Sequence, residues 1–369
     1  MSDQQDTLIV ILDDDLDKVS NLADDLRERY AVQSLEPWHL DEDTLRHGTV
    51  FLVDLFLRDW PGRERLDPSA QIYDGIALAA LIRARARHEK RHIPIIALNT
   101  GHAEDFSGLP SEIREHAIAR AHNLEWVFLK NDTRSRVATY ERVGELVEAQ
   151  RRLPREWRAE TGEQELLKVL DAHEDELSDV LDGWPPIREV SADSAGIALL
   201  RWLLHRILPY PCFLLESRYV AARLGITCGS LEEIVGAEQD ELGRRLGRCR
   251  YTGILGGFDG PRWWRSRLEG MLWELSGAEG LPATTSTLQA HTSVELKRAA
   301  ISNGVVVLRA DYTTEEESVD VAEAVRIRLD DWPPYAEEPW AAIKDVLEDQ
   351  GLRERVLPLD RQRLERRQS

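Results

Sequence analysis

The chain has 369 residues, 42% of them hydrophobic, and this length predicts two or three domains with cores of their own. Its formal net charge of −20 argues against a general nucleic-acid binder, and against DNA as a partner, because such proteins need a basic surface. Cys212, Cys228 and Cys249 are not spaced as C-x-x-C, so we expect reduced thiols and no zinc site.

Two classes of cell location are also argued against. No apolar run is long enough to span a membrane, and the N-terminal residues lack the pattern of a signal peptide. We therefore expect a cytoplasmic protein without a membrane partner.

Predicted strands and helices alternate through residues 1–150, the first predicted domain. Short apolar runs with β-branched residues are typical of buried strands, and stretches with a helical period separate them. This alternation predicts an α/β domain with a parallel sheet and helices on both faces. The strands are Leu8–Leu12, Val32–Leu35, Val50–Leu57, Pro94–Leu98 and Glu125–Leu129; the helices are Asp17–Tyr30, one opening at Asp74-Gly75, Glu115–His122 and Thr133–Gln150.

Charged side chains end three of these strands. Asp13 and Asp14 end the first strand, Asp54 ends the third, and Lys130 ends the fifth. In a doubly wound sheet these ends meet at one edge, where carboxylates repel each other unless a hard cation lies between them. Mg²⁺ prefers such oxygen ligands, and an ammonium nearby offsets negative charge. The set fits transfer of a phosphoryl group onto a carboxylate.

Four short motifs occur in a fixed order along this domain. Through them, residues 8 to about 148 resemble a response-regulator receiver domain. The motifs are Leu12-Asp13-Asp14-Asp15, Val53-Asp54-Leu55-Phe56-Leu57, Asp74-Gly75-Ile76-Ala77-Leu78 and Leu129-Lys130.

The resemblance implies a flavodoxin-like five-stranded parallel sheet and a phospho-acceptor role for Asp54. It also implies that Asp13, Asp14, Asp54 and the backbone carbonyl of Phe56 hold Mg²⁺, and that Lys130 contacts the phosphoryl oxygens. The implied partner is a sensor histidine kinase or a phosphotransfer protein.

The sequence departs from the family at several positions. Asn99, followed by Thr100, stands where the family usually has Thr or Ser, and Asn131 replaces the usual proline. We expect Asn99 and Thr100 in the site, with Asn99 able to donate a hydrogen bond to a phosphoryl oxygen. The segments Trp60–Tyr73 and Gly101–Ser111 are longer than usual and are expected to border the site. The alternative is a degenerate receiver that serves as a binding platform without being phosphorylated.

Residues 151–186 predict a charged helical linker. Leucines and valines at helical spacing favour one helix over Pro154–Leu181, stopped by Gly183 and the prolines after Trp184. A solvated connector and a dimerising helix, which would make the protein a homodimer, are both consistent with this pattern.

Residues 187–369 predict a mostly α-helical second domain with a few strands, in which we recognise no family. Ala195–Leu208 is apolar nearly all round and predicts a buried helix. Ser217–Leu224 and Ser230–Val235 have the spacing of a helix-turn-helix, but Glu232 and Glu233 in the second helix do not suit a DNA phosphate backbone.

Three further segments complete the second half. Gly253–Gly260 predicts a loop, Arg262–Arg265 the start of a helix, and Val294–Ala300 another helix. No catalytic constellation is evident after residue 150.

The sequence therefore predicts a two-component response regulator whose phosphorylation at Asp54 controls an output domain that binds a protein target. Enzymatic activity beyond the receiver's own phosphorylation and dephosphorylation is not expected. The alternatives are a DNA-binding transcription regulator acting through residues 217–235, and an enzyme regulated in cis by the receiver.

Overall fold

The computed structural model describes twelve stretches of the chain, which form two compact units. Unit 1 contains Met1–Leu177, Trp184–His205 and Gly253–Asp259, and unit 2 contains Ser178–Gly183, Arg206–Thr252 and Gly260–Ser369. The described residues are 7–57, 74–89, 91–106, 111–130, 137–153, 161–187, 195–237, 239–276, 285–297, 303–309, 313–314 and 317–368.

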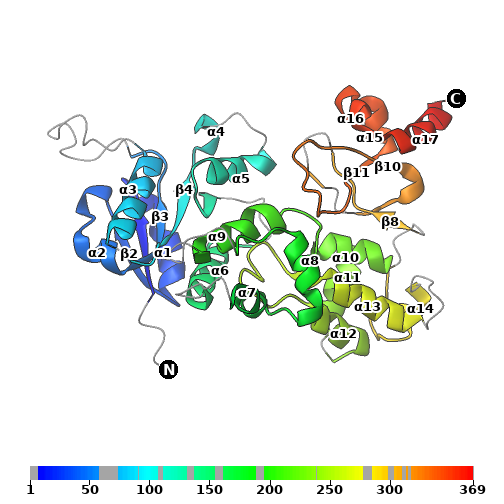
Figure 1. Ribbon diagram of the computed structural model, residues 1–369, viewed down its shortest axis with the longest axis horizontal. Coiled ribbons are helices and arrows are strands. Elements are labelled where there is room, and N and C mark those ends of the chain that lie inside the picture. Colours follow the sequence, from blue (N-terminus) through cyan, green and yellow to red (C-terminus); the bar gives the residue numbers. More distant parts are fainter. Residues whose placement is uncertain are drawn as a thin grey trace. The chain divides into compact units, whose positions relative to one another are not determined.

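Unit 1 is built on a five-stranded sheet with strand order β2-β1-β3-β4-β5 (Figure 1). Each neighbouring pair of strands is parallel. This order is that of the doubly wound flavodoxin-like fold, so the predicted receiver fold is confirmed. The strands are β1 (Leu8–Leu12), β2 (Ala31–Leu35), β3 (Gly48–Val53), β4 (Ile95–Thr100) and β5 (Trp126–Leu129).

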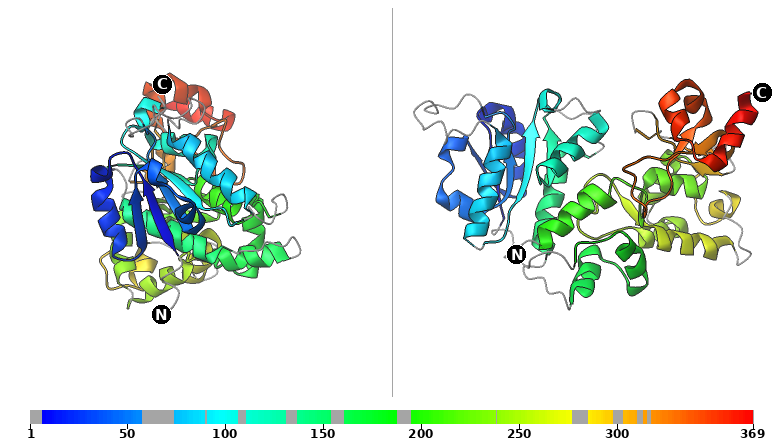
Figure 2. Two further views of the ribbon diagram at one scale, coloured as in Figure 1. Left: turned by 90° about the vertical axis from the view of Figure 1, so that its left-hand side faces the viewer. Right: turned by 45° about the horizontal axis from the view of Figure 1, so that its top comes forward.

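Helices flank this sheet (Figures 1 and 2). Helix α1 contacts α6, and α2 contacts α3. The core between sheet and helices is apolar, with Val10, Leu12, Phe51 and Val53 fully buried. The helices are α1 (Ser20–Arg27), α2 (Glu42–His47), α3 (Gly75–His88), α4 (Ala103–Phe106), α5 (Ser111–Ala121) and α6 (Thr139–Arg152).

Unit 1 also includes segments that come after the receiver-like domain in the sequence. One is helix α7 (Gly162–Leu170), where the Val169 carbonyl accepts a hydrogen bond from the backbone N–H of Ile254 at 3.1 Å. Helix α9 (Ala195–Trp202) continues into a π-helical segment, Leu203–Ile207. The expected apolar, buried helix over Ala195–Leu208 is therefore present, although its last turns are π-helical.

Unit 2 is mostly helical, with short antiparallel strand pairs, as expected for the second half. Strand β6 pairs with β7, β8 with β9, and β10 with β11. The strands are β6 (Leu214–Glu216), β7 (Arg262–Trp264), β8 (Gly304–Val305), β9 (Val319–Asp320), β10 (Ala324–Arg326) and β11 (Trp340–Ala342).

Unit 2 has a small apolar core of Val307, Ala324 and Ala342 and two larger ones. One lies among α10 to α13 and contains Leu224, Leu246 and Trp263; the other lies under β10, β11 and the C-terminal helices. The helices are α8 (Leu177–Asp182), α10 (Ser217–Leu224), α11 (Cys228–Gly236), α12 (Glu241–Cys249), α13 (Arg265–Ser276), α14 (Thr285–Gln289), α15 (Ile343–Glu348), α16 (Gln350–Arg355) and α17 (Pro358–Gln368).

Three predictions for the second half were wrong. The segment Pro154–Leu181, predicted as one helix, is divided into α7 and α8. Asp171 has a left-handed backbone with φ 52° and ends α7. Arg262–Trp264 is strand β7, so the helix begins only at Arg265. Of the helix predicted over Val294–Ala300, residues 294–297 are not helical, and residues 298–300 lie outside the described ranges.

Among the described residues, no helix combines the length and the apolar character that a membrane span requires.

Candidate functional site

The site is formed where strands β1, β3 and β5 end. Asp13 and Asp14 follow Leu12, Asp54 follows Val53, and Lys130 follows Leu129. The backbone continues the sheet past these ends, because Asp54 N donates to the Leu12 carbonyl at 2.8 Å and Lys130 N to that of Thr100 at 2.8 Å. Backbone pairing thus places the side chains at one edge of the sheet.

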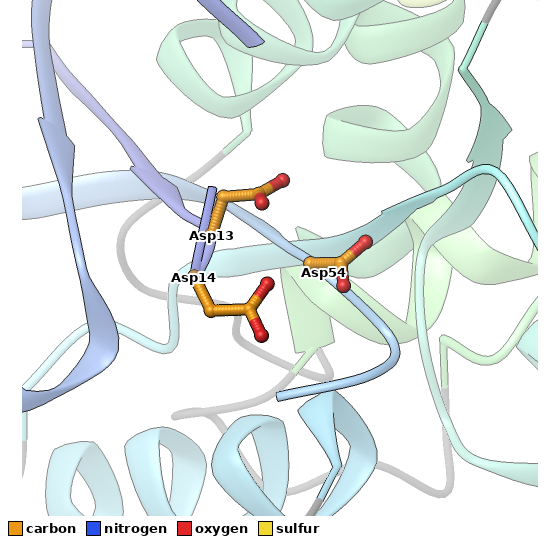
Figure 3. Close-up of side chains that lie close together, drawn as sticks. All are labelled: Asp13, Asp14 and Asp54. Atoms are coloured by element: carbon orange, nitrogen blue, oxygen red, sulfur yellow. The ribbon is translucent and has the colours of Figure 1, made fainter. Parts of the chain in front are cut away.

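The three carboxyl groups lie close together (Figure 3). One oxygen from each of Asp13, Asp14 and Asp54 lies within 4.8 Å of the other two. Asp13 is 1% exposed and Asp54 7%, while Asp14 is half-buried. So dense a group of carboxylates, largely shielded from water, requires compensating positive charge.

Lys130 supplies part of that charge. Its Nζ lies 2.7 Å from Asp13 Oδ2 and 2.9 Å from Asp54 Oδ1, so one ammonium bridges both carboxylates. These charge-assisted hydrogen bonds are short. They are also largely shielded from water, because the Lys130 side chain is only 13% exposed.

Burial and neighbouring charge both shift the proton affinities here. Burial, helped by the nearby Asp54 charge, raises the pKa of Asp13 above its ordinary value, although the Lys130 hydrogen bond opposes this. Burial lowers the pKa of Lys130, but the hydrogen bonds and charges of Asp13 and Asp54 outweigh it, so the net pKa is raised. Lys130 therefore remains an ammonium at neutral pH.

The Asp54 side chain is held from both sides. Lys130 Nζ donates a hydrogen bond to Oδ1 at 2.9 Å, and the Phe56 backbone N–H donates one to Oδ2 at 3.1 Å. Behind it, Gly75 begins helix α3 so close to the strand that an added Cβ would lie 2.1 Å from the Asp54 carbonyl oxygen. Only glycine fits at that approach, which explains the Asp74-Gly75 pair at the start of the helix.

Asn99 and Thr100 are the last residues of β4 and are both buried, at 3% and 0% exposure. Thr100 contributes its carbonyl to Lys130 N, while its Oγ1 accepts the N–H of His102 at 3.1 Å. The Thr100 hydroxyl is thus engaged in its own loop. A hydrogen bond from Asn99 to a phosphoryl group stays a prediction.

The donor set fits a hard divalent cation. The clustered carboxylates of Asp13, Asp14 and Asp54 offer the oxygen ligands that Mg²⁺ prefers, and Mg²⁺ keeps several waters as its remaining ligands. The expected contribution of the Phe56 carbonyl stays a prediction.

Some predicted features of the site lie outside the described residues. These are Asn131, the segment from 58 to 73 that includes most of the first long loop, and residues 107–110 of the second.

Sequence reasoning missed a second charged cluster in unit 1, centred on Glu125. This carboxylate is 0% exposed, accepts from Arg201 Nε at 2.7 Å, and lies 3.3 Å from Arg83 Nη2. It thereby ties strand β5 to helices α3 and α9. The available signal was Arg201 itself, an arginine in an otherwise apolar helix, which requires a buried counter-charge.

Aromatic rings extend this cluster. His205 Nε2 lies 3.1 Å from the Leu124 carbonyl, and the His205 ring stacks on Trp126 with an interplanar angle of 1°. His116 and Phe258 meet the Trp126 ring edge-on, at centroid distances of 4.7 and 4.9 Å.

Comparison with solved structures finds response regulators among the similar chains. A CheY-like receiver domain protein from Methanospirillum hungatei JF-1 has 16% identity and a TM-score of 0.25, over 39% of this chain and 96% of that chain. A chain in the complex of the CheA3 P1 domain with CheY6 from R. sphaeroides has 15% identity and a TM-score of 0.24, over 40% and 95%. The RcsB response regulator of Salmonella typhimurium has 17% identity and a TM-score of 0.22, over 54% and 98%.

Scans of protein-family models and of curated proteins gave no match. The identities and TM-scores of the similar structures are too low to carry an argument about function.

Proposed function

We propose that the N-terminal domain is a phosphoryl-accepting receiver and that Asp54 is the acceptor. The carrying observation is the bridge formed by one ammonium, that of Lys130, between the buried carboxylates of Asp54 and Asp13. A structural ion pair needs one carboxylate for one ammonium. Here one ammonium serves two buried carboxylates, and an oxygen of Asp14 lies within 4.8 Å of both; this close group of carboxylates supports a cation-dependent site.

In the reaction, a carboxylate oxygen of Asp54 forms a bond to the phosphorus of the donor. The bond from phosphorus to the leaving group breaks, its electron pair departs with the leaving group, and an acyl phosphate remains on Asp54. Lys130 offers its positive charge to the phosphoryl oxygens, and the Phe56 N–H keeps the carboxyl group oriented.

Asp13 and Asp14, with Asp54, would hold Mg²⁺, and the bound ion supplies positive charge against the phosphoryl oxygens. Because Lys130 is already paired with Asp13, that pair must loosen or be shared when a phosphoryl group arrives. The site thus changes its ion pairing on modification, and such a change is the local event on which a switch depends.

The donor in this proposal is the phosphohistidine of a sensor kinase or phosphotransfer protein. The output is exerted by the second half of the chain on a target molecule. Segments that pack on β5, namely α9 and residues 253–259, are the parts of the chain best placed to transmit the change.

The test is phosphoryl uptake, measured by intact mass after incubation with Mg²⁺ and acetyl phosphate. We expect wild type to gain one phosphoryl group, and Asp54→Asn to gain none. Asp25→Asn, at an exposed position of α1, removes the same charge away from the site and is expected to behave as wild type. Removing Mg²⁺ with EDTA should abolish the gain. Equal labelling of wild type and Asp54→Asn, or no labelling of wild type, contradicts the proposal.

A further inference from the structure

Unit 2 contains a compact set of three helices that the proposed function does not use. Helix α10 ends at Leu224, Gly225 turns the chain with φ 67°, and α11 starts after Thr227, whose Oγ1 caps the N–H of Ser230 at 3.2 Å. The helical pair predicted from sequence is therefore present, with the tight glycine turn of a helix-turn-helix. A third helix, α12, follows it directly.

A small sheet connects the ends of this set. Strand β6 runs straight into α10 and pairs with β7, with Glu216 opposite Arg262. After α12, Arg250 bridges Trp263 in antiparallel fashion, and Tyr251 N donates to the Arg262 carbonyl at 2.8 Å. Strand β7 thus pairs both with β6, before α10, and with the residues that follow α12. This pairing fixes the direction of α12 relative to α10 and α11.

Helix α12 is strongly two-sided. Leu242, Leu246 and Cys249 are buried in the core of the helical set. On the other side Arg244 and Arg248 are exposed.

Two further arginines adjoin this side of α12, which also carries the exposed Glu241, paired with Arg245. Gly247 lies between them with open space where a side chain would stand. Arg250, directly after the helix, is exposed, and Arg267 of α13 donates to the Arg248 carbonyl at 3.5 Å.

The three exposed arginines carry uncompensated charge. Within the described part of the chain, Arg244, Arg248 and Arg250 form no ion pair, whereas Arg245, on the flank of α12, is neutralised by Glu241 and Glu274. These three arginines lie within seven positions of one another, in a chain with a net charge of −20. We call Arg244, Arg248, Arg250 and Arg267 the α12 arginine face.

We propose that the α12 arginine face binds the phosphate backbone of double-stranded DNA. Arg244 and Arg248 stand one turn apart, about 6 Å along the helix axis, a separation of the same order as that of successive phosphates on one strand. An arginine guanidinium group can donate two parallel hydrogen bonds to a phosphate group. The open space at Gly247 leaves room for the DNA backbone to approach. The major groove of B-DNA admits a single helix of this kind, while that of A-form RNA is too narrow.

The position of this face removes one of the two reasons against DNA, namely the acidic second helix of the pair. Glu232 and Glu233 are exposed on α11 and do keep that helix away from phosphates. The contact is assigned instead to α12, the helix that leads into the strand pair. Because the face lies wholly in unit 2, the inference does not depend on phosphorylation of Asp54.

The test is binding of the full chain to a short mixed-sequence duplex, followed by fluorescence anisotropy with and without Mg²⁺ and acetyl phosphate. We expect binding that weakens steeply between about 50 and 200 mM salt. The double variant Arg244→Ala/Arg248→Ala should lose about tenfold or more in affinity, and its salt slope should fall by about 2.

The matched control is Arg206→Ala/Arg328→Ala, which removes two exposed arginines of unit 2 from other elements and should change affinity less than about twofold. Thermal unfolding checks that both double variants are folded. The proposal is overturned if wild type fails to bind the duplex at low salt under both conditions. It is equally overturned if the two double variants bind alike, or if a polyglutamate peptide competes as well as the duplex.

Discussion

Gly75 determines how closely helix α3 can approach the acceptor carboxylate. A Cβ at this position would meet the Asp54 carbonyl oxygen at 2.1 Å and its carbonyl carbon at 3.0 Å. Both atoms belong to backbone that is fixed in the sheet, because Asp54 N donates to Leu12 and Gly75 N to Leu55. The contact cannot be relieved by rotating a side chain, so either the helix or the acceptor must move.

We therefore expect Gly75→Ala to lower the free energy of unfolding by about 1–3 kcal/mol and to reduce phosphoryl uptake at Asp54. The control is Gly270→Ala in α13, where a Cβ meets nothing within 4 Å. That change should instead stabilise the chain by about 0.5–1 kcal/mol, because alanine loses less backbone entropy in a helix. Urea unfolding of both variants measures this, and equal stability of Gly75→Ala and wild type would contradict it.

Residues at strand ends could be predicted well, whereas buried pairs could not. Asp13, Asp54 and Lys130 each follow an apolar run, and the rule that parallel strands end at one edge brings them together. Glu125 also adjoins such a run, but its partner Arg201 is 76 positions away, and no local pattern links the two.

At the scale of single elements, the π-helical end of α9 carries a histidine that is buried as a neutral base. Nε2 of His205 must carry the proton in its bond with Leu124, because a carbonyl only accepts. Burial lowers the pKa of His205 to about 4, although the hydrogen bond to Leu124 and the nearby Glu125 charge oppose this. Burial, with a further contribution from the neighbouring His205, likewise lowers the pKa of His116 to about 3.

These shifts predict acid sensitivity of unit 1. The folded pKa of His205 lies below its unfolded value of about 6.5, so the unfolded chain binds more protons as the pH falls. The contribution of neutral His205 to the free energy of unfolding is fully present above about pH 6.5. It declines as the pH falls toward 4. Between pH 7 and 5 we expect a loss of about 1–2 kcal/mol from His205 alone.

Urea unfolding at the two pH values measures this loss. His205→Asn keeps a donor for Leu124 but does not titrate, so its stability should depend less on pH than that of wild type. His88→Asn, at an exposed position of α3, removes an imidazole outside this cluster and serves as the control. Identical pH dependence for His205→Asn and wild type would rule out this role.

Element boundaries show where local patterns stop being informative. Helix α10 was predicted with its true ends, because Glu216 and Gly225 flank an uninterrupted helical segment. Arg262–Trp264 was predicted as helix and is a strand, because pairing with β6 and not the local sequence decides its conformation. The division after α7 depends on a left-handed Asp171, a backbone state that aspartate adopts only occasionally.

At the scale of the whole molecule, the two units are interleaved along the chain. Unit 1 is completed by Trp184–His205 and Gly253–Asp259, which are separated from the receiver-like domain by residues of unit 2. These late segments supply Arg201 to the buried Glu125 and Phe258 to the ring of Trp126. The predicted boundary at residue 150 stays a prediction, but a chain that ends near it would lack both partners.

We therefore expect a fragment of residues 1–177 to be less stable than the full chain and to bind hydrophobic dyes, since Trp126, His116 and the Glu125 charge lose their cover. Thermal unfolding and dye fluorescence of the fragment and the full chain measure this. Adding Glu125→Gln to the fragment should lower its stability further, because the buried Arg83 then loses its counter-charge. A fragment with the melting temperature of the full chain and no dye binding would show that the late segments do not contribute to the stability of unit 1.

The contact between Phe258 and Trp126 has a consequence for biosynthesis. The two residues are 132 positions apart, and both rings are buried when they meet, with their centroids 4.9 Å from each other. At ordinary rates of translation, the ribosome needs on the order of ten seconds to pass from one to the other. During that interval the nascent receiver has all five strands but a bare aromatic surface beside β5. A newly made chain therefore passes through a stage at which this apolar surface is exposed. We expect chaperones to bind it there, until residues 253–259 have been made and cover it.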